Sequence, residues 1–141
     1  MRFSGFCELV DYGAAEWGDT VALVHGDERA EVTWTAFADL VKARAAELAT
    51  GARCEAIVAD GSLGCVAEVF AANRAGRSVV MLDENLSEQM RLELCAATGA
   101  DALWVGGAEK TLNCTRPFLT VSQPCRSAGQ RAPRHHPDDG R

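Results

Sequence analysis

Long apolar runs, an apolar leader and lysine are all scarce in this sequence of 141 residues. No apolar run approaches the roughly 20 residues that a membrane-spanning helix needs, so we expect no membrane contact. Residues 1–6 lack the apolar stretch of a secretory signal peptide. Together these absences lead us to expect a cytoplasmic protein.

Local motifs for nucleotide binding and for nucleophilic catalysis are missing as well. The sequence has no Gly-x-x-x-x-Gly-Lys-Ser/Thr loop, and its only lysines are Lys42 and Lys110. It has no Gly-x-Ser-x-Gly turn, which would mark a nucleophilic serine. The pair Gly61-x-x-Gly64 is too short and too poor in glycine to indicate a dinucleotide site. We therefore predict no catalytic residue from the local sequence.

The cysteines and histidines form no familiar metal-binding pattern. The six cysteines include no Cys-x-x-Cys pair, and several fall on apolar faces, which favours buried free thiols over a disulfide framework. His135 and His136 follow Cys114 and Cys125 at spacings that match no familiar zinc site. We predict no metal site.

The charge is unevenly distributed along the chain. Residues 1–105 hold 8 Lys and Arg against 17 Asp and Glu, a balance of −9, whereas residues 106–141 carry +3. An acidic body repels nucleic acids and anionic membranes at long range. Neither is therefore expected as a partner.

Sequence periodicity first predicts a helix and a hairpin. Apolar residues at helical spacing indicate a short helix over residues 6–17, although Gly13 lowers its helix propensity. Two β-type runs, at 20–25 and 31–34, flank a Gly-Asp turn and predict a β-hairpin.

A second helix is expected over residues 35–50, with Thr35 as its N-terminal cap. Its apolar residues are spaced so that they share one face of that helix. These residues are Phe37, Leu40, Val41, Ala45 and Leu48.

From residue 54 onwards, strands and helices alternate with short connections. Strands joined by single helices run parallel and are covered on both faces of the sheet. Residues 78–82 are apolar except for the first, as expected for such a buried strand. The sequence therefore predicts an α/β fold in which a Rossmann-like layered sheet follows the helix and hairpin. The expected elements are strand 54–59, helix 63–74, strand 78–82, helix 87–98 and strand 101–105.

Polar residues follow two of these strands, where open parallel sheets bind their ligands. Asp60, Ser62 and Asp83 are the weak candidates for contacts to a cofactor. The same residues also suit turns and helix caps, since Asp and Ser side chains bond readily to nearby backbone. Both interpretations remain open.

Three segments resemble the N-terminal part of one enzyme family in order and spacing. They are "DTVALVHGDERAEVTWTAFADL", "ARCEAIVADGSLGCVAEVFAANRAGRSVVMLDENL" and "LCAATGADALWV". Over about residues 6–105 the chain resembles the AMP-forming adenylating enzymes, which include acyl- and aryl-CoA synthetases, peptide-synthetase adenylation domains and luciferases. The resemblance implies that residues 1–105 are the N-terminal portion of an AMP-binding synthetase or ligase domain.

That family activates a carboxylic acid with ATP and passes the acyl group to a thiol such as coenzyme A. The resemblance therefore implies ATP, Mg²⁺ and coenzyme A as cofactors, although no residue present supports any of them. The family's phosphate loop, acidic ribose-binding motif and C-terminal lysine lie beyond the matched stretch, and residues 106–141 contain none of them. The chain is thus expected to be catalytically incomplete.

Residues 106–141 have a different composition from the rest. One more strand is possible near 118–121, and after residue 124 the apolar periodicity disappears, which predicts an irregular tail. A frameshift or truncation that left a non-native C-terminus is one explanation.

Two functions from different classes follow. The chain is either a fragment of an adenylate-forming ligase, inactive or dependent on a separate polypeptide, or a non-catalytic α/β module that binds a small ligand or a partner. A fragment would leave apolar surface uncovered, so self-association is expected.

Overall fold

The computed structural model of the chain describes residues 5–26, 29–48 and 50–112. The strand expected near 118–121 and the tail expected to be irregular after residue 124 lie outside the described residues. Also outside them are Cys114, Cys125, His135 and His136.

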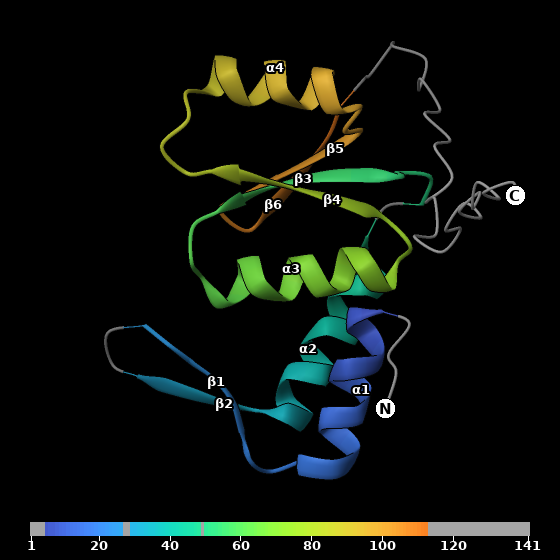
Figure 1. The fold of residues 1–141 in the computed structure, drawn as a ribbon, viewed down its shortest axis with the longest axis vertical. Helices are drawn as coiled ribbons and strands as arrows, with labels where there is room; N and C mark the ends of the chain where they lie inside the picture. The colour runs from blue at the N-terminus through green and yellow to red at the C-terminus, as the bar shows by residue number, and fades with distance from the viewer. Residues whose placement is uncertain (1–4, 27–28, 49, 113–141) are drawn as a thin grey trace, which may run out of the picture.

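The N-terminal half forms two helices and a β-hairpin. Helix α1 spans Phe6–Trp17 and helix α2 spans Trp34–Glu47. Between them, strands β1 (Val21–His25) and β2 (Ala30–Thr33) pair antiparallel, which confirms the predicted hairpin. The two helices pack against each other, and the hairpin projects away from them (Figure 1).

A four-stranded sheet occupies the C-terminal half. Strands β3 (Cys54–Ala59), β4 (Ser78–Asp83) and β5 (Ala102–Val105) run parallel, as the alternation of strands and helices predicts. Strand β6 (Ala108–Thr111) adds antiparallel to β5 through a tight turn. The strand order is β4-β3-β5-β6, so β3 is central and β4 is an edge.

Helices cover both faces of this sheet. Helix α3 (Leu63–Arg74) lies on one face and helix α4 (Glu88–Thr98) on the other (Figure 1). Helices α1 and α2 pack on the side of α3 that faces away from the sheet. The layered α/β fold is therefore confirmed, with an extra helical layer formed by the N-terminal half.

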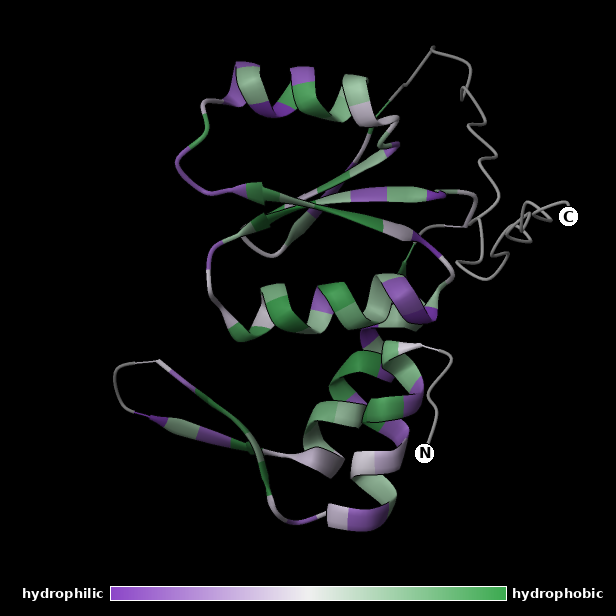
Figure 2. Cartoon of the chain, viewed as in Figure 1, coloured by the Kyte–Doolittle hydropathy of each residue, from purple (hydrophilic) through white to green (hydrophobic). Residues whose placement is uncertain are grey.

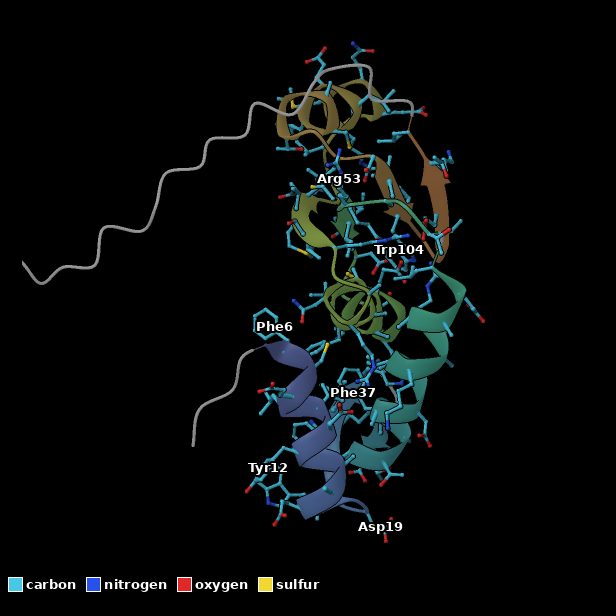
Figure 3. All side chains as sticks on the ribbon, turned by 90° about the vertical axis from the view of Figure 1, so that its right-hand side faces the viewer. Phe6, Tyr12, Asp19, Phe37, Arg53 and Trp104 are labelled. Carbon is cyan, nitrogen blue, oxygen red and sulfur yellow. The ribbon has the colours of Figure 1, made fainter. Side chains whose placement is uncertain are left out.

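The core follows from this layering. On β3, Ala56 and Val58 belong to the cluster under α4, whereas Ile57 packs with Cys65 and Trp104 beneath α3. Figure 3 labels Trp104 between the sheet and α3. Helix α3 is mostly apolar because it is covered on two sides, while α4 mixes polar and apolar residues (Figure 2). A separate cluster joins α1, α2 and α3, and its buried members are Val10, Phe37, Ala38, Val41 and Ala67.

The cap of helix α2 differs from the prediction. Thr33, not Thr35, precedes the helix with extended backbone, and its hydroxyl accepts a hydrogen bond from the amide of Ala36 at 3.2 Å. Strand β2 runs directly into the helix, so Trp34 is already helical and Thr35 lies in the first turn. The expected cap at Thr35 is therefore wrong by two residues.

Two expected burial patterns also differ. Leu40 is exposed, and Ala38 takes its place among the buried residues of α2, because α1 and α3 approach the helix from that side. Met81 on β4 is 50% exposed, although a strand buried on both faces was expected there. As an edge strand, β4 is only partly covered, and the strand buried along nearly its whole length is β3.

The state of the cysteines and the length of the helices can be compared with the predictions from the sequence. Cys54, Cys65 and Cys95 are buried cysteines that form no disulfide within the described residues, as predicted, while Cys7 is half-buried. Among residues 5–26, 29–48 and 50–112, no helix combines the length and apolar character needed to cross a membrane.

Candidate functional site

The carboxyl ends of β3 and β4 lie next to each other at one edge of the sheet. Ala59, the last residue of β3, is the register partner of Asp83, the last residue of β4. Asp60 follows directly, so the structure brings the sequence-predicted candidates Asp60, Ser62 and Asp83 to neighbouring strand ends. All three are exposed.

Asp60 and Ser62 make local hydrogen bonds that organise the start of helix α3. The Ser62 amide donates to Asp60 Oδ1 at 2.9 Å, and the Ser62 hydroxyl accepts from the Cys65 amide at 3.0 Å. Hydrogen bonds from Ser62, first from its side chain and then from its backbone, lower the pKa of Asp60. Ser62 is thus the N-cap of α3, and a ligand contact by this pair stays a prediction.

Asp83 has a similar local role in the loop before α4. Its Oδ1 accepts hydrogen bonds from the Asn85 amide at 2.8 Å and from Asn85 Nδ2 at 3.0 Å. These two bonds, the backbone one first, lower the pKa of Asp83. The helix itself is capped by Ser87, whose hydroxyl accepts from the Met90 amide at 3.2 Å. A ligand role for Asp83 likewise stays a prediction.

An open surface depression of about 440 Å³ lies where the start of α1 meets the end of α3. Its charges are largely paired within the chain, since Arg74 Nη1 donates to both carboxylate oxygens of Asp11 at 3.1 Å. The Cys7 thiol donates to Asn73 Oδ1 at 3.3 Å, and burial raises the pKa of this thiol. The depression is lined by Gly5, Cys7, Glu8, Asp11, Asn73 and Arg74.

The most unusual polar feature is a buried cluster of three carboxylates and two guanidinium groups, which we call the carboxylate–arginine cluster. Its members come from four elements and one loop, and they converge where α2, α3 and the sheet meet. Sequence reasoning did not predict it. The members are Glu55 on β3, Glu68 on α3, Arg77 before β4, Arg44 on α2 and Glu109 on β6.

Arg44 reaches the cluster from helix α2. Its Nε and Nη2 donate to the two oxygens of Glu68, the second at 2.9 Å, which forms a bidentate pair. Nη2 also approaches Glu109 Oε2 at 3.4 Å. The Glu68 side chain is 1% exposed, and hydrogen bonding to it is the largest of the effects that raise the pKa of Arg44. The pair therefore links α2 to α3.

Arg77 occupies the other side of the cluster. Its Nη1 donates to Glu55 Oε2 at 2.7 Å and lies 3.3 Å from Glu109 Oε2. The side chains of Arg77 and Glu55 are 1% and 0% exposed. Burial alone would lower the pKa of Arg77, but the hydrogen bonds to Glu55 and Glu109 outweigh it and raise this pKa.

Glu55 is the least satisfied member. Its second oxygen, Oε1, is buried and accepts no hydrogen bond from a donor in the described part of the chain. Burial, followed by a side-chain hydrogen bond with Glu68, raises the pKa of Glu55 from 4.5 to about 8. A hydrogen bond between two carboxyl groups requires a proton on one of them.

These three carboxylates could in principle attract a cation, because one oxygen of each lies within 4.8 Å of the others. However, both oxygens of Glu68 already accept hydrogen bonds from Arg44, and Arg77 contacts both Glu55 and Glu109. Only Glu55 Oε1 is left open. The arrangement is therefore an internal ion network.

The sequence held a weak signal for this cluster. Glu55 is a lone acid in the apolar strand CEAIVA, and Glu68 is a lone acid within the apolar run of α3. Such residues need a partner when buried. Arg44 and Glu109 could not be assigned as partners, because nothing in the sequence placed α2 or β6 against these two acids.

Comparison with known proteins identifies the fold. No protein-family model and no curated protein sequence matches the chain. Among solved structures, the Klebsiella oxytoca NpsA N-terminal subdomain superposes on 72% of this chain with a TM-score of 0.64 and 22% identity. The same subdomain in complex with 3-hydroxyanthranilyl-AMSN gives a TM-score of 0.65 and 23% identity.

A second solved structure agrees. IdnL1 matches 86% of this chain with a TM-score of 0.64 and 14% identity. The chain spans only 27% of the NpsA subdomain and 30% of IdnL1. Its fold therefore resembles the N-terminal part of an adenylating enzyme, as the sequence resemblance implied.

Proposed function

We propose that this chain supplies the N-terminal layers of a cytoplasmic, AMP-forming acid ligase and needs further polypeptide to complete the active site. In this reaction a carboxylic acid and ATP give an acyl-adenylate and pyrophosphate, and the acyl group then passes to a thiol such as coenzyme A. The observation that carries the proposal is the fold match to the NpsA N-terminal subdomain over 72% of this chain.

The charges of the chain support the need for further polypeptide to complete the active site. Adenylyl transfer develops negative charge on the leaving pyrophosphate, which positioned cations and backbone amides must offset. Lys42 lies on α2, 3.9 Å from Asp11, and Lys110 lies on β6. Neither belongs to a glycine-rich loop, and residues 1–105 carry −9.

The residues at the strand ends fit ATP and Mg²⁺ poorly by themselves. Asp60 and Asp83 already accept hydrogen bonds that organise their own turns, and the negative charge of both carboxylates would repel a triphosphate. We therefore assign the nucleotide site of the proposed ligase to the polypeptide that completes it.

Aromatic carboxylic acids are the first substrates to test. The NpsA structures hold 3-hydroxyanthranilyl-AMSN, 3-hydroxybenzoyl-AMSN and anthranilyl-AMSN. An assay panel should thus begin with anthranilic and hydroxybenzoic acids and continue with fatty acids and amino acids.

The test is acid-dependent exchange of labelled pyrophosphate into ATP. We expect no exchange with the chain alone at any acid in the panel. The DNA that follows its codons is then sequenced and translated in all frames, and any polypeptide with an adenylation-type phosphate loop is added. Exchange is expected only with both polypeptides present.

Two results would contradict the proposal. Exchange by the chain alone, lost in the double variant Asp60→Ala/Asp83→Ala, would place a complete site within it. If neither the downstream frames nor a neighbouring gene encodes a phosphate loop, the proposal is contradicted, and the alternative of a non-catalytic binding module is favoured. Binding of adenosine nucleotides by the isolated chain, measured by calorimetry, then tests that alternative.

A further inference from the structure

We propose that the carboxylate–arginine cluster is a proton-binding site, in which one proton on Glu55 Oε1 is shared with the carboxylate of Glu68. This inference concerns the interior of the chain and is independent of the proposed ligase function. It rests on the count of charges, on the open oxygen of Glu55 and on the contacts around both acids.

The count of charges favours one bound proton. With every group ionised, three carboxylates face two guanidinium groups, which leaves one negative charge in a site where Glu55 and Glu68 are fully buried. An unbalanced charge in such surroundings is costly. One proton brings the cluster to neutrality without moving any side chain.

The contacts favour Glu55 as the group that carries this proton. Arg44 donates to both oxygens of Glu68, so each of these oxygens already accepts a charge-assisted hydrogen bond. Glu55 receives one short bond from Arg77 on Oε2, whereas its Oε1 has no donor in the described chain. A hydroxyl at Oε1 turns that oxygen into a donor, and Glu68 is its acceptor.

A divalent cation is a poorer occupant of the same position. It would bring the cluster to a net positive charge and would lie beside Arg44 and Arg77, whose guanidinium groups repel it. It would also have to displace the arginine bonds to Glu68 to gain a second ligand. The proton needs neither change.

The proton stabilises the junction between the helical layer and the sheet. The cluster ties β3, α3, α2 and β6 together, since Arg44 contacts both Glu68 and Glu109 and Arg77 contacts both Glu55 and Glu109. Two other titratable groups of the described residues border it: Glu47 lies 3.3 Å from Arg44 on the exposed side, and the Cys65 thiol lies close enough to Glu68 to feel its charge. Release of the proton leaves two facing carboxylates, which repel each other and weaken this junction.

The expected dependence on pH follows from linkage. The folded state holds the proton up to about pH 8, whereas an unfolded chain releases it near 4.5. Raising the pH between these values therefore favours unfolding, and the unfolding equilibrium constant rises by up to about tenfold per pH unit. Above the upper value both states have lost the proton, and the dependence levels off.

The experiment measures urea unfolding of the full chain from pH 5 to pH 10 in the wild type and three variants. Glu55→Gln replaces the protonated acid with a neutral isostere that also donates a hydrogen bond, so the rise of the unfolding equilibrium constant with pH should disappear. Glu68→Gln leaves two carboxylates facing two guanidinium groups, which are balanced without a proton, so the rise should disappear in this variant too. Glu16→Gln, an exposed residue on α1, is the control and should keep the wild-type rise.

Infrared spectroscopy of the folded wild type gives a second readout, which does not require either variant to fold. The carbonyl band of a protonated carboxyl group should be present at pH 7 and lost as the pH passes about 8. Absence of this band at pH 7, or an unfolding constant that responds to pH equally in the wild type and Glu55→Gln, would overturn the proposal. Stabilisation of the wild type, but not of Glu55→Gln, by added Mg²⁺, Ca²⁺, Mn²⁺ or Zn²⁺ would assign the site to a metal instead.

Discussion

Gly13 on α1 lies directly against the indole ring of Trp34 at the start of α2. A Cβ added there would lie 2.6 Å from Trp34 Cδ2, far inside normal contact distance. The ring of Trp34 is held in place by Trp17, whose ring centroid lies 5.5 Å away. Gly13 therefore lets the two helices approach each other, although its helix propensity is poor.

We expect Gly13→Ala to destabilise the protein. Helix propensity favours alanine by about 1 kcal/mol, but forcing a methyl group into a packed contact costs about 1–3 kcal/mol. The net loss should be up to ~2 kcal/mol, measured by urea unfolding. Ala15→Gly, on the exposed side of the same helix, is the control and should lower stability by about 1 kcal/mol. A Gly13→Ala variant more stable than the wild type would show that propensity outweighs the contact.

Glu55 is a residue whose interaction partners could not be predicted from the sequence. A buried acid in an apolar strand signals a partner, yet the partners of Glu55 are Arg77, 22 residues away, and Glu68 on the helix between them. Sequence periodicity predicts which side of an element is covered but not which charged groups meet there. Asp60, Ser62 and Asp83, by contrast, were correctly assigned to strand ends, because their positions depend only on the ends of the strands.

At the scale of elements, boundaries were predictable wherever turn or cap residues mark them. Strand β3 and helix α3 match their expected bounds, since Asp60, Gly61 and Ser62 separate them. Strand β6 was missed because the sequence of Ala108–Thr111 shows no alternation of apolar and polar residues. The strand forms through its pairing with β5. The passage from β2 into α2 was misplaced because no turn residue interrupts it.

The cap of α2 provides a test at this scale. Thr33→Ala removes the hydroxyl that accepts from the Ala36 amide and should lower stability by about 1 kcal/mol. Thr35→Ala alters an exposed residue in the first turn and should be neutral or slightly stabilising, because alanine has the higher helix propensity. Urea unfolding of both variants measures the difference. A larger loss of stability for Thr35→Ala than for Thr33→Ala would show that Thr35 is the cap after all, as the sequence suggested.

At the scale of the whole molecule, apolar surface remains on an otherwise layered fold. Strand β4 is an edge strand whose one partner within the described residues is β3, and Met81 on it is half exposed. An exposed edge strand with apolar side chains is a template for pairing with another chain. Large apolar residues more than a third exposed are Phe6, Trp17, Val21, Val24, Leu40, Met81, Met90, Leu92 and Leu94.

We expect the isolated chain to self-associate through the β4 edge. Its net charge of −6 opposes association, but salt screens this repulsion over about 8 Å at physiological ionic strength, whereas edge pairing acts at contact. Sedimentation equilibrium should therefore give a mass above 15.0 kDa that rises with concentration. Met81→Lys places a charge on the edge and should shift the chain towards monomer. Met90→Lys adds the same charge at a comparably exposed position on α4 and should change the mass little. A wild-type chain that stays monomeric at every concentration, with no binding of a dye for apolar surface, would show that the β4 edge is protected without a partner.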